Sequence, residues 1–126
     1  VLMEHALALV EEGHGQFAQI SGFEVHYDLN LEPGQRVRRI TAFGETLLRD
    51  RNILSTTTLD LVTIDFVALD GDGYPFRQLD MHFTVIPVSY QQALLEYLRS
   101  SGGLAGVVDA SRYGFYAPRR LIPSQP

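Results

Sequence analysis

The middle of the chain carries the stretch Asp65-Phe66-Val67-Ala68-Leu69-Asp70-Gly71-Asp72-Gly73-Tyr74. It places a carboxylate, Asp72, between two glycines, and the aromatic Phe66 precedes that carboxylate in an apolar run. Glycines let a backbone approach a ligand closely, a carboxylate can accept hydrogen bonds from the vicinal hydroxyls of a ribose, and an exposed ring can stack on a base. On the residues alone, the plainer interpretation is favoured: a strand that ends in an ordinary Asp-Gly turn, with Phe66 in the core.

The sequence on either side predicts an α+β fold, with a largely antiparallel sheet and helices near both ends of the chain. Apolar and polar residues alternate from Phe23 to Leu29, which is typical of a strand with one buried face. Glu32-Pro33-Gly34-Gln35 is a turn signal, so this strand and the next are expected to form a hairpin. The expected elements are a helix over 2–12 ended by Gly13, strands over 16–28, 36–43, 53–68 and 82–88, a turn at 44–46, a helix capped by Ser89 and Gln92 and stopped at Gly102-Gly103, and weak strands at 107–108 and 113–116.

Length and composition bound the kind of protein. The 126 residues, 45% of them hydrophobic, fit one folded domain over 1–126. The run from Val1 to Leu7 already has a helical pattern with no capping residue before it, so the domain is expected to be incomplete at its N-terminal end. A net charge of −5 argues against a nucleic-acid partner, which requires a cationic surface. No membrane-spanning segment is expected, because no run approaches about 18 apolar residues.

The sequence matches none of the catalytic and metal-binding motifs tested against it. The four histidines are far apart in the sequence and predict no metal site. A calcium loop that starts at Asp70 would need glycine and glutamate where Pro75 and Met81 stand. Neither a Gly-x-Ser-x-Gly elbow nor a P-loop occurs, so we expect no catalytic residue in this chain. The three arginines in the segment 36–39 are interpreted as a solvated strand edge.

Three stretches, in the same order, resemble the C-terminal domain of the 5′-nucleotidase family. Residues 65–74 follow a pattern close to Asn/Asp-Phe-x-Ala-x-Gly-Gly-Asp-Gly-Phe/Tyr. Residues 17–28 resemble the family's Gln-x-Ser-Gly and Tyr-Asp strands, and residues 33–37 resemble its Pro-Gly-x-Arg-Val turn. Asp70 departs from the pattern, since the family has glycine there. Aspartate tolerates positive φ better than most residues, so we expect the turn to survive, although the added charge bears on nucleotide affinity.

The resemblance implies roles for the central residues. In the family, the phenylalanine is one half of an aromatic clamp around the nucleobase, which implies that role for Phe66. The aspartate between the last two glycines binds the ribose hydroxyls, which implies that role for Asp72, with Gly71 and Gly73 beside the substrate. The other aromatic of the clamp and the arginines that hold the phosphate are implied to precede Val1.

The resemblance further implies that the full-length protein is a metal-dependent hydrolase of nucleoside 5′-monophosphates or related nucleotides, and that this chain is its substrate-binding part. Two divalent metal ions are implied in an upstream domain of the same protein, and the chain alone is expected to hydrolyse nothing. The implied location is the periplasm or the cell surface. The alternative is a non-catalytic binding or interaction module derived from the same fold.

Overall fold

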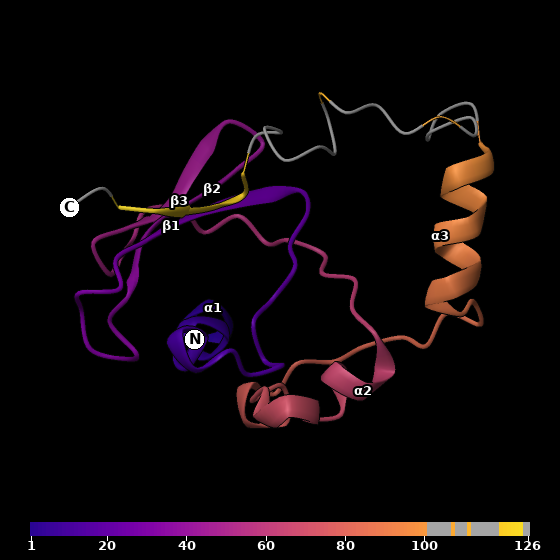
Figure 1. Cartoon of the computed structure of the whole chain (residues 1–126), viewed down its shortest axis with the longest axis horizontal. Helices are drawn as coiled ribbons and strands as arrows, with labels where there is room; N and C mark the ends of the chain where they lie inside the picture. The colour runs from indigo at the N-terminus through magenta and orange to yellow at the C-terminus, as the bar shows by residue number, and fades with distance from the viewer. Residues whose placement is uncertain (101–106, 108–110, 112–118, 125–126) are drawn as a thin grey trace. The chain divides into compact units, whose positions relative to one another are not determined.

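The computed structural model describes residues 1–100, 107, 111 and 119–124. They belong to two compact units, one made of Val1–His82 with Arg119–Pro126 and the other of Phe83–Pro118. In the first unit, a five-stranded sheet has the order β4-β3-β2-β1-β5, and helix α1 lies against one face of it (Figure 1). That residues 1–126 form a single domain stays a prediction. The elements are α1 (Leu2–Leu7), the 3₁₀ helix η1 (Val10–Glu12), β1 (Phe23–Tyr27), β2 (Val37–Ala42), β3 (Glu45–Arg49), β4 (Asn52–Ile53), α2 (Asp65–Ala68), the 3₁₀ helices η2 (Gly71–Gly73) and η3 (Arg77–Leu79), β5 (Leu121–Pro123) and, in the second unit, α3 (Tyr90–Arg99).

The sheet is antiparallel except at one edge. β1 and β2 form the predicted hairpin, and β2 continues into β3 through a tight turn at Phe43 and Gly44, whose φ angles are 52° and 78°. Two positive φ values in succession match the twist of a short hairpin loop. β5 runs parallel to β1, with Leu121 opposite Val25. The predicted α+β class and largely antiparallel sheet are confirmed.

Two apolar clusters hold the first unit together. The alternation in β1 directs Val25 and Tyr27 inward, where they pack with Leu7 of α1 and Val37 of β2. A second cluster joins Ala6 of α1 to Tyr74 and Phe76 beyond the central loop. Two successive residues of α1 therefore pack in different places: Ala6 packs on the loop region and Leu7 packs on the sheet.

Arg36 connects α1 to the sheet through its guanidinium group, and the residue is buried, with only 5% of its surface exposed. Its Nη1 donates to the carbonyl oxygens of Leu7 at 2.6 Å and Ala8 at 3.2 Å, and the group also forms an ion pair with Glu11. Carbonyls at the end of a helix lack intrahelical partners, so this side chain caps α1. The interpretation of segment 36–39 as a solvated edge is wrong for Arg36, and β2 is an interior strand.

Glu4 completes the connection from the helix side. Its two carboxylate oxygens accept hydrogen bonds from the backbone N–H groups of Arg36 and Val37, each at 2.9 Å. A charged acceptor makes such bonds stronger than neutral ones. The first turn and the end of α1 are thus both fixed to the start of β2.

The predicted strand over 53–68 is wrong in most of its length. Only Asn52–Ile53 pairs with β3, residues 54–64 form no regular element, and Asp65–Ala68 is a short helix. The predicted strand over 82–88 is also absent from the described structure. β-branched and aromatic residues favour an extended backbone, but a strand forms only where another strand offers hydrogen-bond partners, and Pro87 supplies no N–H for such pairing.

The helical predictions hold in part. The first helix ends at Leu7 and gives way to η1, and Gly13 terminates this segment with a φ of 68°. Ser89 caps α3 as predicted, accepting from the N–H of Gln92 at 3.1 Å, although the Gln92 amide donates to Glu96 instead of completing the capping box. β3 begins where a turn at 44–46 was expected. The expected stop at Gly102-Gly103 and the weak strands at 108 and 113–116 lie outside the described residues, and Val107 is in no strand.

Replacing Arg36 by Met should destabilise the protein by about 2–4 kcal/mol, because the buried carbonyl of Leu7 and the partly buried carbonyl of Ala8 lose their donor. The free energy of unfolding from urea denaturation measures the effect. Arg38→Met is the matched control, since Arg38 in β2 forms an exposed ion pair with Asp50 and its loss should cost less than about 1 kcal/mol. Equal losses for the two variants would contradict the role given to Arg36.

The Arg36–Glu11 pair also makes stability depend on acid pH. The hydrogen bond from Arg36 lowers the pKa of the Glu11 carboxyl below its ordinary value. The stability contributed by this ionised carboxyl is therefore complete above its unfolded-state pKa and is lost as pH falls through the lower pKa of the folded state. Glu11→Gln should flatten the stability profile on the acid side of the ordinary glutamate pKa, measured by urea denaturation at each pH. An unchanged acid slope would contradict the assignment.

Candidate functional site

The central stretch folds into two short turns of helix separated by a tight bend. α2 covers Asp65–Ala68, and η2 follows at Gly71–Gly73. Three residues around η2 have left-handed backbone conformations: Asp70 with a φ of 68°, Asp72 with 51° and Gly73 with 73°. The prediction that the turn survives with aspartate at position 70 is confirmed.

Phe66 is on the surface and not in the core. It is 54% exposed, so the plainer interpretation of the sequence, with Phe66 buried, is wrong. Its ring lies directly against Gly71, because a Cβ atom added at that glycine would be 2.6 Å from both Cδ1 and Cε1 of the ring. Gly71 is therefore required for the close approach of the Phe66 ring, whereas Gly73 is required for its positive φ.

Asp72 presents an exposed carboxylate at the tip of the bend. Within the described part of the chain, this carboxylate has no hydrogen-bond or ion-pair partner, while the backbone carbonyl of Asp72 is bonded to Nε2 of His5 at 2.8 Å. The carboxylate oxygens can thus accept hydrogen bonds from an added ligand, and the backbone beneath them is held in place.

Asp70, the departure from the family pattern, is turned toward Arg77. Its Oδ1 accepts from the backbone N–H of Arg77 at 3.1 Å, and its Oδ2 is 3.6 Å from Nε of the same residue. The guanidinium group offsets the extra negative charge next to Asp72. Asp70 therefore stabilises the bend in the manner of an Asp in a turn.

Tyr74 anchors the far end of the loop. Its ring is buried against His5, and its hydroxyl donates to the carbonyl of Gln16 at 2.5 Å. Burial, with a smaller contribution from the charge of Asp72, raises the pKa of the Tyr74 hydroxyl, so it stays protonated as a donor at neutral pH. No pattern in the sequence indicated the involvement of His5 and Gln16, because they are far from the loop along the chain.

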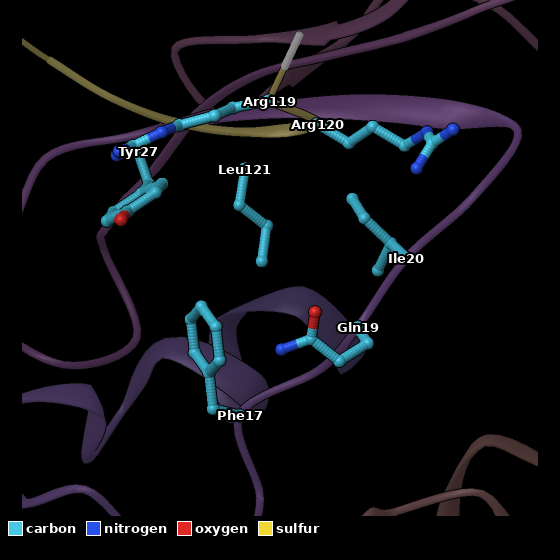
Figure 2. A pocket seen from close by; sticks show the side chains of 7 residues that line it. All are labelled: Phe17, Gln19, Ile20, Tyr27, Arg119, Arg120 and Leu121. Carbon is cyan, nitrogen blue, oxygen red and sulfur yellow. The ribbon is translucent and has the colours of Figure 1, made fainter. Parts of the chain in front are cut away.

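An open pocket of about 300 Å³ lies beneath the sheet (Figure 2). Figure 2 shows the Phe17 ring pointing toward the sheet, with Tyr27 and Leu121 on the opposite side. Phe17 follows Gln16, whose carbonyl accepts the hydrogen bond from the Tyr74 hydroxyl. A residue that lines the pocket is therefore next in the sequence to the residue that holds Tyr74. The remaining lining residues are Gln19, Ile20, Arg119 and Arg120.

Neither a metal cluster nor a membrane-spanning helix was found where the structure is described. No three or more His, Asp or Glu side chains gather there in a way that could hold a metal ion. No helix in the described segments is both long and apolar enough to cross a membrane.

Residues 2–79 match the family model described as "5′-nucleotidase, C-terminal domain", which covers both α1 and the central loop. The chain therefore belongs to the 5′-nucleotidase C-terminal domain family.

Among its relatives is the trifunctional nucleotide phosphoesterase protein YfkN of Bacillus subtilis (strain 168), with 37% identity over 73 residues, which are 57% of this chain and 5% of that protein. A 5′-nucleotidase precursor from Thermus thermophilus has a similar solved structure, with a TM-score of 0.67 and 23% identity over 99% of this chain and 23% of its own. That structural match supports the fold. The chain spans only a small part of either relative.

Gly71→Ala should displace both the ring and the backbone carbonyl of Phe66, because the added methyl group would overlap the two. The expected cost in unfolding free energy is about 1–3 kcal/mol, typical of overpacking. Gly15→Ala is the control: its Cβ would have only an ordinary contact, 3.9 Å from Oδ2 of Asp72, and stability should change by less than about 0.5 kcal/mol. Urea denaturation and the NMR shifts of the Phe66 ring measure both effects. Unchanged ring shifts in Gly71→Ala would show that the ring does not rest on this glycine.

Proposed function

We propose that this chain is the substrate-binding part of a metal-dependent nucleotide phosphohydrolase and that it holds the nucleoside moiety. One observation carries the proposal: the exposed ring of Phe66 and the unpartnered carboxylate of Asp72 project from one tightly constrained loop in the described structure. Membership of the 5′-nucleotidase C-terminal family supports a nucleotide as the substrate class of this loop.

The two side chains suit the two parts of a nucleoside. Phe66 stacks on the base, an interaction worth about 1–3 kcal/mol for a single aromatic contact. Asp72 accepts hydrogen bonds from the 2′- and 3′-hydroxyls of the ribose, because a carboxylate offers two adjacent oxygens. Gly71 and Gly73 keep the loop free of side chains that would block this approach.

The second ring of the aromatic clamp is proposed to come from another segment of the full-length protein. Phe17 does not fit this role, because its ring points toward the sheet and packs against the apolar cluster there (Figure 2). Gly15 and Gln16 do lie beside the loop: a Cβ at Gly15 would be 3.9 Å from the carboxylate of Asp72, and Gln16 accepts the hydrogen bond of Tyr74.

Phosphate release belongs, in this proposal, to another domain of the full-length protein. Metal ions there would supply charge stabilisation at phosphorus. The residues described here bind and orient the nucleoside, so the chain alone should hydrolyse nothing. Export to the periplasm or cell surface is proposed with it, because the Thermus thermophilus relative is described as a precursor.

In the full-length protein, Phe66→Ala should raise KM for a nucleoside monophosphate by roughly 5- to 150-fold with little change in kcat, because stacking stabilises substrate and transition state alike. Phe43→Ala is the matched control, since Phe43 is 87% exposed in the turn between β2 and β3. Steady-state kinetics measure both variants. A similar KM for Phe66→Ala and the wild type would contradict the clamp.

Asp72→Ala should reduce the preference for ribonucleotides over 2′- and 3′-deoxy analogues, because only the ribose offers both hydroxyls to the carboxylate. The ratio of kcat/KM values for the two sugars measures this preference. Equal losses for ribose and deoxyribose substrates would contradict the role of Asp72. Nucleotide binding in a full-length protein that hydrolyses no phosphoester would favour the non-catalytic module.

A further inference from the structure

We propose that His5 is a positioning residue for substrate recognition: it holds the backbone of Asp72 so that the carboxylate points outward to the sugar hydroxyls. This inference rests on the proposed function of the loop. His5 lies in α1, far from the central stretch in the sequence, and no motif in the chain assigns it a role.

The contact between His5 and the loop has a defined direction. The Nε2 atom of His5 is 2.8 Å from the carbonyl oxygen of Asp72. A carbonyl oxygen can only accept, so Nε2 of His5 is the donor of this hydrogen bond. The same ring lies against the next residue, because a Cβ at Gly73 would be 3.3 Å from Cε1 of His5. His5 therefore fixes the peptide unit between Asp72 and Gly73.

Further contacts close a ring of interactions around this peptide unit. The His5 and Tyr74 rings pack edge to face with centroids 4.7 Å apart, and Tyr74 donates to the carbonyl of Gln16. The side-chain amide of Gln16 then donates to the carbonyl of His5 at 2.9 Å. The loop is thus bonded to α1 both directly and through Gln16.

The loop needs this external support because of its own backbone. Asp72 has a φ of 51°, in the left-handed region that costs free energy for any residue other than glycine. In the described structure its carboxylate makes no bond that would hold this conformation. If the bond from His5 were lost, Asp72 could relax to a right-handed or extended conformation, and its side chain would leave the position that faces the sugar.

Two nearly isosteric variants separate the hydrogen bond from the bulk of the side chain. His5→Gln keeps an N–H donor for the Asp72 carbonyl, whereas His5→Met has a similar length and no donor. The dissociation constants of adenosine and 2′,3′-dideoxyadenosine are measured for each variant of the 126-residue chain by NMR titration. His5→Met should lose about 3- to 10-fold of the preference for adenosine with unchanged affinity for the dideoxy compound, and His5→Gln should retain the preference. His26→Met controls for the replacement of a histidine in the sheet, because His26 lies in β1 and contacts Arg39.

Amide hydrogen exchange tests the anchoring without any ligand. The N–H groups of Gly73 and Tyr74 donate within the loop to Asp70 and Gly71, at 3.1 and 3.2 Å. They should exchange about tenfold faster in His5→Met than in His5→Gln, while the N–H of Val25 in the sheet keeps its rate. Equal loop exchange in the two variants would overturn the positioning role whatever the titrations give.

The two measurements also separate this inference from the function on which it rests. Faster loop exchange together with an unchanged adenosine preference in His5→Met would overturn the substrate role of His5 alone, provided that Asp72→Ala abolishes the preference. If the wild type itself does not distinguish adenosine from the dideoxy compound, the proposed function fails, and the substrate role of His5 fails with it.

Discussion

The buried guanidinium of Arg36 is the interaction on which the rest of the first unit depends. It binds the carbonyls at the end of α1, while Glu4 in the same helix binds the start of β2. A helix of six residues is too short to be stable by itself, so its place is set by these bonds and by its apolar contacts. Because α1 carries His5, the geometry of the central loop depends in turn on how Arg36 fixes the helix to the sheet.

Local patterns predicted those parts of the fold that local interactions determine. The β1–β2 hairpin follows from alternation and a turn signal, and the start of α3 follows from the oxygen of Ser89. The segment 53–68 could not be predicted in this way, since its apolar residues suit a strand but only Asn52–Ile53 has a neighbouring strand to pair with. The burial of Arg36 could not be predicted either. A charged residue near a strand normally faces water, and the partners of Arg36 are far from it in the sequence.

The candidate site, too, could be predicted only where local sequence patterns determine it. Phe66 and Asp72 were predicted from the motif and its resemblance to a family, and whether they bind substrate stays a prediction. The exposure of Phe66 and its contact with Gly71 required the structure, since the residues alone favoured a buried ring. His5 and Gln16 carry no local pattern that indicates a contact with the loop, because folding alone brings them together.

The parallel strand β5 has a consequence for self-association. It covers the edge of β1 through the N–H of Val25, which donates to the carbonyl of Arg120, and through the N–H of Ser124, which donates to the carbonyl of Tyr27. An uncovered strand edge offers its backbone groups to any other extended chain. A protease that removed residues 119–124 would take Leu121 away from the apolar cluster and open this edge, so the nicked protein would be prone to add strands from its own copies and to aggregate.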